Sequence, residues 1–481
     1  MRRVMLASAG VLLAVSTYAA ADVLDAAPGI LTLDRPVPVP TPTVSGSPAP
    51  VVLPEPAVVD PVLADTGSDA PVPTAAGLER ALTAASGDPA LDGGVGISVR
   101  DGITGEELWA LDADRPRVPA STAKLLAALA VVDGVDLGAT MATRVVAPAG
   151  STDLVLVASG DTLLAPGTGD PDAVAGRAGL ADLAAEVADA LAPSGARTAT
   201  LRLDLSWAPG PRYPSTWNPN DVRDGFTQAV VMTGLATQLP AAGRPSPRFP
   251  EREVARVFAE ALSDRGIRAT LAPERTWTEP APAGALELGS VESATYADVL
   301  DLALDRSENA LTENLVRQAA ATAGRPTTGQ GDNADFIVER LTAHDVPTEG
   351  LVLKDASGLS PDQAASAATL SGVLRLAAVE ASGQLPELRG VLAGLPVGGL
   401  SGTLRRRFTA DATQDVAGVP RAKTGTLRAG SALAGTTVSA DGRPLTYVVL
   451  VDEFPETFGG TQRARAALDR IVAALTRCGC R

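Results

Sequence analysis

Two segments of this sequence, one near each end of its expected folded part, have the pattern strand, turn, strand. Residues 95–112, VGISVRDGITGEELWALD, carry two strand-like runs around DGITG, and residues 431–454, SALAGTTVSADGRPLTYVVLVDEF, carry two around ADGR. A helical pattern precedes the first segment, from about residue 76, and another follows the second segment at about 461–476. Two hairpins accompanied by helices predict an antiparallel sheet flanked by helices, an α/β fold of the α+β kind.

The N-terminal part of the chain is expected to lie outside this fold. Residues 1–21, MRRVMLASAGVLLAVSTYAAA, combine two arginines, an apolar run and small residues before a cleavage site after Ala21. They predict a signal peptide, with an uncleaved membrane anchor as the alternative. Residues 22–75 are rich in proline, which excludes regular helices and central strands, so they predict an extended linker. Both interpretations of the first segment place the folded part outside the cytoplasm, whether secreted, in the cell wall or membrane-anchored.

Composition argues against several classes of function. The formal net charge of −16 disfavours nucleic-acid binding, which requires clustered lysine and arginine. The chain has one histidine, and its two cysteines, Cys478 and Cys480, lie among its last four residues, so the usual zinc ligands are not grouped. No metal or cofactor is therefore expected. The Cys-Gly-Cys end allows a strained disulfide or free thiols, and we expect a loose tail.

Lysine is rare in this chain, since three of its 40 basic residues are lysines. One of them, Lys124, lies three residues after Ser121 in VPASTAKLLAALAVV (118–132), at the start of an apolar helical run. This spacing places both side chains on one face of a helix. A serine hydroxyl needs a base to become a nucleophile, and lysine can be that base, whereas arginine stays protonated. Taken alone, the pair is more simply an N-cap serine beside a solvated lysine.

Two further motifs change that interpretation. LDRSENALTENLVRQ contains Ser307-Glu308-Asn309, and PRAKTGTLRAGSALAG contains Lys423-Thr424-Gly425 just before a predicted strand. Singly, each matches a turn or a cap by chance. In the order Ser-x-x-Lys, Ser-x-Asn, Lys-Thr-Gly, they match the motifs of β-lactamases and penicillin-binding proteins. With one histidine in the chain, a Ser-His-Asp triad has little support.

The chemistry of these residue types gives each a role. We expect Ser121 to attack an acyl carbon and Lys124 to take its proton. Ser307 can relay a proton to the leaving amine, and Asn309 can orient Lys124 and hydrogen-bond the substrate amide. Lys423 adds a positive charge that keeps a neighbouring amine neutral and attracts a substrate carboxylate.

The strand expected after Lys423 supplies three substrate-binding positions, Thr424, Gly425 and Thr426. The backbone N–H groups of Ser121 and Thr426 would form an oxyanion hole. Gly425 would let the substrate backbone approach closely, because glycine has no Cβ.

Beyond the motifs, the sequence resembles the class C low-molecular-mass penicillin-binding proteins, the D-alanyl-D-alanine carboxypeptidase/endopeptidases of the DacB type. The likeness spans roughly residues 76–475 and includes LVLVASGDTLL (154–164), VESATYADVLDLALDRSENALTENLVRQ, LKDASGLSP and LPVGGLSGTLRRRF. It implies a β-lactamase/transpeptidase-like fold and a serine enzyme. That enzyme would remove the terminal D-alanine of peptidoglycan stem peptides, or cut their cross-links, through an acyl-enzyme, and β-lactams would acylate the same serine.

Members of this family carry a long insertion between the first two motifs. In this chain residues 125–306 separate Lys124 from Ser307. The resemblance therefore implies a catalytic domain at 76–145 and 290–481, with an inserted domain or domains at about 146–289.

Two stretches depart from the family. The loop DASGLSP (355–361) has Ala356 and Pro361 where the family reads DGSGLSR, and it is either a simple turn or part of the cleft lining. WNPNDVRDGFTQAVVMTGLATQ (217–238) is only loosely similar, so substrate preference is not indicated. Lys354 lies outside the core motifs and receives no role.

Two other functions stay open as alternatives. A β-lactamase or esterase of the same fold is disfavoured by the long insertion and by the absence of Tyr-x-Asn at the second motif. A non-catalytic cell-wall scaffold would not need the three motifs. The expected partners are peptidoglycan stem peptides and β-lactams, without nucleic acid, and with any membrane association through the N-terminal segment. The sequence indicates neither an oligomeric state nor the balance of carboxypeptidase and endopeptidase activity.

Overall fold

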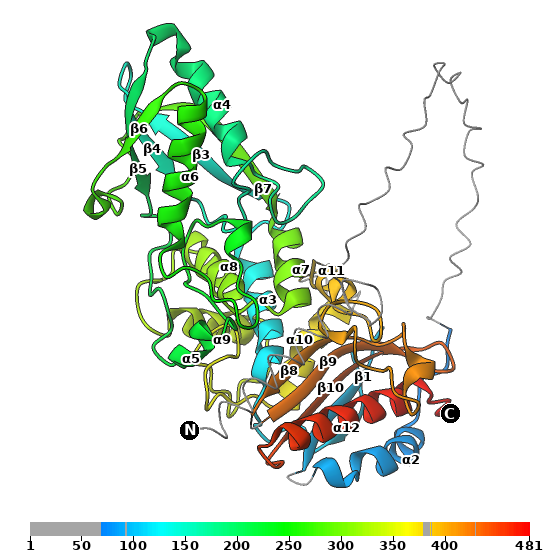
Figure 1. Ribbon diagram of the computed structural model, residues 1–481. Coiled ribbons are helices and arrows are strands. Elements are labelled where there is room, and N and C mark those ends of the chain that lie inside the picture. Colours follow the sequence, from blue (N-terminus) through cyan, green and yellow to red (C-terminus); the bar gives the residue numbers. More distant parts are fainter. Residues whose placement is uncertain (1–68, 92–93, 379–384, 386, 429) are drawn as a thin grey trace, which may run out of the picture. The chain divides into compact units, whose positions relative to one another are not determined.

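An antiparallel sheet of five strands unites the two ends of the folded chain (Figure 1). In the computed structural model, β1 (Val95–Asp101) and β2 (Glu107–Leu111) form the first predicted hairpin, and β9 (Gly430–Val438) and β10 (Pro444–Asp452) form the second. The hairpins join through β1 and β10, and β8 (Arg421–Leu427) pairs with β9 at one edge. The order is β2-β1-β10-β9-β8 with every pair antiparallel, which confirms the predicted sheet.

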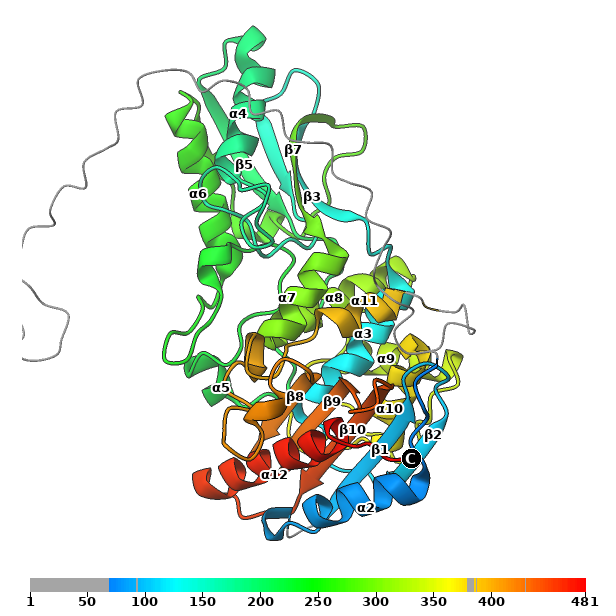
Figure 2. The same ribbon diagram turned by 90° about the vertical axis from the view of Figure 1, so that its right-hand side faces the viewer.

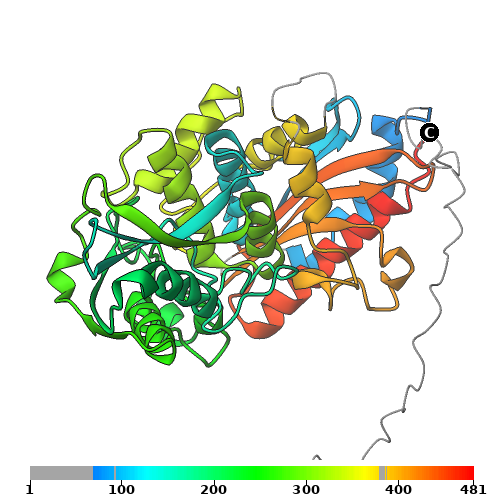
Figure 3. The same cartoon turned by 90° about the horizontal axis from the view of Figure 1, so that it is seen from above.

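Helices cover both faces of this first sheet. Helix α12 (Phe458–Thr476) packs on β9 and against α2 (Ala75–Ser86), while α10 (Ala367–Ala378) packs on β10 and β1, and α11 (Glu387–Gly394) packs on β8. Figure 3 shows the orange strands with the red α12 on one side and the yellow α10 and α11 on the other. Strand β10, PLTYVVLVD, is almost continuously apolar because it is buried on both faces. The predicted last helix is confirmed, and it begins three residues earlier than expected.

A second sheet of five strands is built from the segment between the first two motifs. Its order is β6-β5-β4-β3-β7, with β4, β5 and β6 parallel and the remaining pairs antiparallel. The strands are β3 (Thr140–Ala147), β4 (Asp153–Val157), β5 (Thr198–Asp204), β6 (Arg268–Leu271) and β7 (Leu286–Thr295). Helices α4 (Leu180–Leu191) and α6 (Pro250–Asp264) pack on this sheet and on each other, as Figure 2 shows.

The other α-helices of the described residues include the two that carry Lys124 and Asn309. They are α3 (Ala123–Gly134), α5 (Pro219–Arg223), α7 (Tyr296–Arg306), α8 (Asn309–Thr322) and α9 (Asp332–Ala343). Helix α3 contacts α8, α9 and α10, and ten of its twelve residues are buried. An all-round apolar helix is typical of a central core position, and this one fixes Lys124 in that core.

The structure describes residues 69–91, 94–378, 385, 387–428 and 430–481. The predicted signal peptide and residues 22–68 of the predicted linker lie outside the described residues, and Ala75, the last residue of that linker, begins α2. The division into a catalytic part and an insertion stays a prediction; its boundaries at 146 and 289 fall inside β3 and β7. Over the part of the chain that is described, no helix combines the length and apolarity needed to cross a bilayer.

The C-terminal cysteines do not form the loose tail expected from the sequence. Cys478 and Cys480 are joined in a disulfide, and both side chains are buried. The Thr74 N–H donates to the Cys480 carbonyl at 2.7 Å, and Gly77 leaves the space that Cys480 fills. The expectation was wrong because cysteines are also small apolar residues, and here they pack on the start of α2.

Candidate active site

Ser121 lies in a 3-10 turn, Ala120–Thr122, immediately before α3. The turn is strained, because Ala120 has a φ of 45°, a left-handed conformation that alanine rarely adopts. Two glycines make room for it: a Cβ on Gly358 would lie 2.0 Å from the Ala120 carbonyl oxygen, and one on Gly425 would lie 2.6 Å from that of Pro119. Gly425, the glycine of the third motif, thus leaves room for the Ser121 turn, whereas the sequence suggested that it leaves room for the substrate backbone.

Lys124 is fully buried one helical turn from Ser121. Its Nζ lies 3.1 Å from the Ser121 Oγ, 2.6 Å from the Asn309 Oδ1 and 2.6 Å from the carbonyl oxygen of Ser357. Burial lowers the pKa of Lys124 from 10.5 to about 8, although the nearby carboxyl groups of Asp355, Glu313 and Glu308 act to raise it. The predicted i, i+3 pair is therefore a direct contact. The pKa of its lysine lies near the range in which a group acts as a general base at neutral pH.

Ser307 and Lys423 form a second serine–lysine contact. Ser307 ends α7 in the left-handed conformation, with a φ of 59°, and its Oγ accepts a hydrogen bond of 2.9 Å from the Lys423 Nζ. Lys423 also donates to the carbonyl of Thr424 at 3.0 Å, and it is fully buried. Burial and the charge of Lys124 lower the pKa of Lys423 well below its usual range, while Asp305 acts to raise it.

The loop at 355–361 supports Lys124. The Asp355 carboxylate accepts from the backbone N–H groups of Ser357, Gly358 and Ser360, which curls the loop around it. Glu313, on α8, accepts from the N–H groups of Ala356 and Ser357 at 2.8 and 2.9 Å. These bonds hold the Ser357 carbonyl on Lys124, so the loop belongs to the site and is not a simple turn.

The predicted insertion also reaches the motifs. Trp217 donates from its Nε1 to the Asp355 carboxylate at 2.8 Å. The Asn309 Nδ2 donates to the carbonyl of Phe226 at 2.8 Å, which leaves the Asn309 Oδ1 for Lys124. The stretch at 217–238, only loosely similar to the family by sequence, is thus bonded to both the second motif and the 355–361 loop.

These elements enclose a cleft of about 460 Å³. The residues that line it are Ser121, Asp221, Gly225, Phe226, Pro240, Ala241, Ala242, Arg306, Ser307, Glu308, Asn309, Leu359, Thr426 and Leu427. Lys124 and Lys423 lie behind the two serines, buried, and the side chain of Thr426 is exposed at the edge strand. Thr424 points elsewhere, since its Oγ1 donates to the Thr403 hydroxyl at 3.0 Å. The structure thus gathers the five predicted catalytic residues and Thr426 around one cleft.

Sequence reasoning missed three contributors to this site: the Ser357 carbonyl, Glu313 and Phe226. A carbonyl group has no sequence signature, so Ser357 and Phe226 could not have been found. Glu313 could have been, because it follows Asn309 by four residues on α8 and so shares its helix face. Lys354 pairs with Asp362 at 3.3 Å near the surface, in keeping with its lack of an assigned role.

The sequence of this chain is similar to those of known proteins. The sequence matches the D-Ala-D-Ala carboxypeptidase 3 (S13) family over residues 78–239 and 231–475. It is 34% identical over 446 residues to a carboxypeptidase of Mycobacterium tuberculosis, covering 91% of each protein. It is 33% identical over 433 residues to carboxypeptidase DacB of Mycolicibacterium smegmatis, covering 89% of this chain and 90% of that protein.

The fold is also found among solved structures. Penicillin-binding protein 4 (DacB) of Haemophilus influenzae superimposes with a TM-score of 0.61 and 17% identity, over 83% of this chain and 99% of that one. This likeness confirms the predicted transpeptidase-like fold. The family match covers the described helices and strands from α2 to α12 almost completely. Together these matches confirm the resemblance to DacB-type penicillin-binding proteins, and this chain belongs to the D-Ala-D-Ala carboxypeptidase 3 (S13) family.

Proposed function

We propose that this chain is a serine D-alanyl-D-alanine carboxypeptidase/endopeptidase that acts on peptidoglycan stem peptides, with Ser121 as the nucleophile. The family and its named carboxypeptidase relatives support the substrate class. The observation that carries the assignment of Ser121 is the set of three contacts around the Lys124 Nζ.

Two of these three partners can only accept hydrogen bonds. The Asn309 Oδ1 and the Ser357 carbonyl therefore take the two N–H bonds of a neutral lysine amine. The amine lone pair is then directed at the third partner, the Ser121 Oγ, 3.1 Å away. The neutral lysine thus receives the serine proton as Ser121 attacks the carbonyl carbon of the substrate.

The second serine–lysine pair serves the leaving amine. As the peptide bond breaks, the Ser307 hydroxyl relays to the departing nitrogen the proton that Lys124 took from Ser121, while the Lys423 ammonium holds the Ser307 Oγ by a hydrogen bond of 2.9 Å. The N–H groups of Ser121 and Thr426, both at the cleft, stabilise the oxyanion. Water then hydrolyses the ester on Ser121: its hydroxyl joins the acyl carbon as the ester bond breaks, and Lys124 takes the other water proton and returns it to the serine.

Lys423 needs a counter-ion to stay charged. Burial and Lys124 both lower its pKa, so positive charge on the two amines is mutually unfavourable in the empty cleft. A substrate carboxylate near Lys423 raises its pKa and makes the ammonium favourable. The positive charge of Lys423 therefore depends on the arrival of a peptide with a free carboxyl end.

β-Lactams are proposed ligands of the same serine. A crystal structure of Haemophilus influenzae penicillin-binding protein 4 was solved in complex with a novel β-lactam, and its fold matches this chain with a TM-score of 0.54 at 17% identity. The shared fold supports binding of a β-lactam here, and the Ser121–Lys124 contact supports its attack by Ser121. The signal-like residues 1–21 support a working place outside the cytoplasm, where the stem peptides lie.

The test is covalent labelling of the full chain with a fluorescent penicillin. Wild type is expected to show a stable labelled band that Ser121→Ala abolishes, while Ser263→Ala, which removes an exposed serine on α6, retains it. Mass spectrometry of peptic peptides would locate the adduct, and release of D-alanine from a pentapeptide would confirm the reaction.

Other results would overturn the proposal. A band that persists in Ser121→Ala would exclude Ser121 as the nucleophile. Absence of a band with rapid hydrolysis of penicillin would indicate a β-lactamase, and absence of both in folded protein would indicate a scaffold.

A further inference from the structure

One wall of the cleft is a long loop of the predicted insertion. This loop, residues 212–229, which we call the wall loop, supplies Asp221, Gly225 and Phe226 to the cleft lining. Apart from the five residues of α5, it contains neither helix nor strand. A loop of this length and irregularity depends on contacts with the rest of the protein to keep one conformation.

Arg317, on α8, holds the neck of the wall loop. Its Nη2 donates to the Pro211 carbonyl at 2.6 Å, and its Nη1 donates to the Val230 carbonyl at 3.3 Å. These two residues lie immediately before and after the loop, and the Val230 N–H donates to the Arg212 carbonyl at 2.8 Å. The guanidinium therefore joins both ends of the loop to the helix that carries Asn309.

The surroundings of Arg317 favour one position of its guanidinium. Arg317 is 4% exposed, and a Cβ on Gly210 would lie 2.8 Å from its Nε. Burial lowers the pKa of Arg317 to about 10, although Glu313 and Asp332 act to raise it, so the side chain is charged at neutral pH. A buried charge is unfavourable unless hydrogen bonds compensate for the lost water. The two carbonyl groups at the neck provide such bonds.

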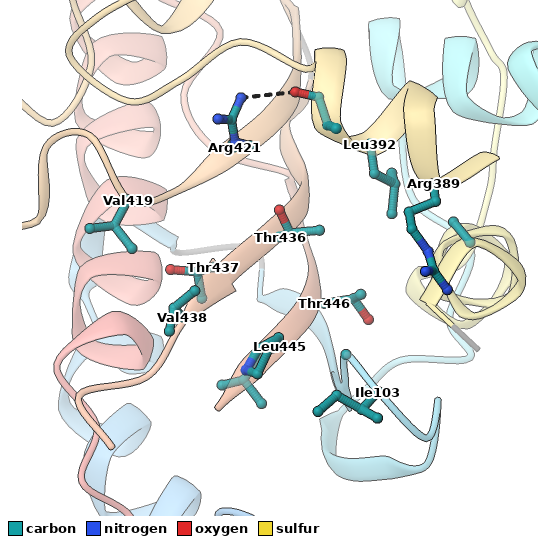
Figure 4. A pocket seen from close by; sticks show the side chains of 14 residues that line it. Ile103, Arg389, Leu392, Val419, Arg421, Thr436, Thr437, Val438, Leu445 and Thr446 are labelled. Carbon is teal, nitrogen blue, oxygen red and sulfur yellow. Dashed lines mark hydrogen bonds between the residues drawn. The ribbon is translucent and has the colours of Figure 1, made fainter. Parts of the chain in front are cut away.

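Arg421 offers a comparison within the same chain. Its Nη1 donates to the Ala393 carbonyl at 2.8 Å, beside a pocket of the first sheet that Leu392 and Val419 also line (Figure 4). Arg421 is exposed, so water competes for its hydrogen bonds. Arg317 is buried and bonds two segments, one on each side of the wall loop, and a buried hydrogen bond fixes its partners more firmly.

The wall loop in turn holds Asn309. The Phe226 carbonyl accepts from the Asn309 Nδ2 at 2.8 Å, and the Asn309 Oδ1 accepts from the Lys124 Nζ at 2.6 Å. If the Phe226 carbonyl moves away, the Asn309 amide is free to rotate and to present its NH2 group to Lys124. Contacts thus lead from Arg317 through the neck and the wall loop to the lysine of the first motif.

We propose that Arg317 is a positioning residue for the acylation of Ser121. Among the described residues, Arg317 is not part of the cleft lining, and it acts by fixing the wall loop, which fixes Asn309 against Lys124. The inference rests on the proposed function, in which Lys124 takes the serine proton. Lysine is a poor substitute for Arg317, because an ammonium lacks the planar fork that reaches two carbonyl groups.

The kinetic test measures acylation of the full chain by penicillin over a range of pH. Arg317→Lys is expected to slow acylation about tenfold, because the site is less well aligned. It should also move the midpoint of the rate to lower pH, because Lys124 loses an acceptor that stabilises its ammonium. Arg325→Lys, at an exposed arginine that follows α8 and pairs with Glu339, is the matched control and should match wild type in both respects.

A double-mutant cycle separates positioning from a merely structural role. If Arg317 acts through Asn309, Arg317→Lys should have little further effect on the residual acylation rate of Asn309→Ala, because the orientation of Asn309 is already lost. A general loosening of the protein would instead slow both backgrounds by the same factor.

Hydrogen–deuterium exchange tests the neck without any chemistry. Backbone amides of residues 212–229 should exchange faster in Arg317→Lys than in wild type or Arg325→Lys, while those of β9 and β10 stay unchanged. Gly210→Ala is the second variant, because its Cβ would displace the guanidinium while the charge on α8 is kept. It should reproduce both the faster exchange and the slower acylation, and it carries the test if Arg317→Lys does not fold.

Three results would overturn the inference. These are unchanged exchange of the wall loop in both variants, an unchanged midpoint in both, or equal slowing by Arg317→Lys with and without Asn309. Failure of the proposed function looks different, because wild type itself would then not be acylated at Ser121. Labelled wild type with variants that behave like it overturns the role of Arg317 alone.

Discussion

The two sides of the cleft hold their lysines in different surroundings. The helix side, which we define as residues 121–124, 308–313 and 355–358, surrounds Lys124 with acceptors and with the carboxyl groups of Asp355, Glu313 and Glu308. The strand side, which we define as Ser307 and residues 423–427, gives Lys423 a hydroxyl and one carbonyl, and the carboxyl group of Asp305 acts to raise its pKa. Both lysines are fully buried, so the difference lies in their neighbours.

This difference separates the tasks of two chemically identical groups. On the helix side, the carboxyl groups partly offset the effect of burial, and the pKa of Lys124 stays at about 8, where it can exchange a proton near neutral pH. On the strand side, burial and the Lys124 charge act together, and the pKa of Lys423 falls well below its usual range. We infer that the helix side is prepared for proton transfer and the strand side for an incoming anion.

Arginine substitutions give the largest expected contrast between the two sides. Arg cannot give up its proton, so Lys124→Arg should lower the rate of penicillin acylation about 10⁴-fold, the upper range for loss of a general base. Lys423→Arg keeps a positive charge near the substrate carboxylate and should lower the rate only about tenfold, less than Lys423→Ala, at about 10²-fold. Stopped-flow acylation kinetics measure all three variants.

Unfolding temperatures provide the control for this contrast, because both side chains are buried and arginine is larger. A Lys124→Arg variant that acylates as fast as Lys423→Arg would show that the two sides do not differ in their need for a titrating group.

The second contrast concerns Gly358, one of the two glycines that leave room for the Ser121 turn. On the helix side, Gly358 has a φ of 76°, and a Cβ there would lie 2.0 Å from the Ala120 oxygen. Gly358→Ala should therefore destabilise the protein by about 2–3 kcal/mol and slow acylation at least about tenfold, since the turn must shift. Differential scanning calorimetry and acylation kinetics measure the two effects.

Gly390→Ala is the matched control, because Gly390 lies in α11 with open space around its Cα. It should leave acylation unchanged and can raise the unfolding temperature slightly. Equal behaviour of the two alanine variants would contradict the close approach of Gly358 to the turn.

The elements that the sequence predicts correctly are those specified by neighbouring residues. The hairpins β1–β2 and β9–β10 have apolar strand segments joined by glycine-containing turns, and the three motifs, at 121–124, 307–309 and 423–425, are runs of three or four residues. The second sheet has no such local signal. Its strands β4, β5 and β6 are parallel neighbours that come from distant parts of the insertion, so their pairing depends on contacts that the sequence does not display.

The same division holds within the site. Ser121, Lys124 and Asn309 could be predicted because the sequence gives the chemistry of their side chains and the spacing within their motifs. The Ser357 carbonyl could not, because its position depends on the curl of the 355–361 loop around Asp355. Trp217 had a weak signal, as one of four tryptophans in the chain, placed in a polar stretch. Its partner, Asp355, is visible only in the fold.

A smaller effect is expected from Asp161, a buried carboxyl outside both sides of the cleft. Burial raises its pKa from 3.8 to about 7, although its Oδ1 accepts from the Leu163 N–H at 2.7 Å. A raised folded-state pKa means that its contribution to the free energy of unfolding is present below about pH 4 and is lost as the pH rises through 7. Asp161→Asn keeps the acceptor and should be more stable than wild type by about 2 kcal/mol at pH 8, but not at pH 4.

Urea unfolding at both pH values measures this difference. Asp153→Asn, at an exposed position on β4, is the control and should show little change at either pH. A stabilisation of Asp161→Asn that is equal at pH 4 and pH 8 would show that ionisation of Asp161 is not its cause.

The finest test of the helix side is the pH at which Lys124 becomes a base. Acylation should rise with pH through the pKa of Lys124, about 8, because the neutral amine takes the proton. Burial raises the pKa of Glu313 to about 7, so its carboxyl group is ionised near pH 8, and this charge raises the pKa of Lys124. Glu313→Gln removes the charge while its amide oxygen can still accept from Ala356 and Ser357. The midpoint of the acylation rate should therefore move to lower pH, by up to about one unit.

Glu186→Gln, which removes a carboxyl group bonded to the Ser290 N–H beside the second sheet, should leave the midpoint in place. If the Glu313→Gln midpoint stays or moves upward, the carboxyl groups of the helix side do not set the ionisation of Lys124, and the two sides of the cleft differ in shape alone.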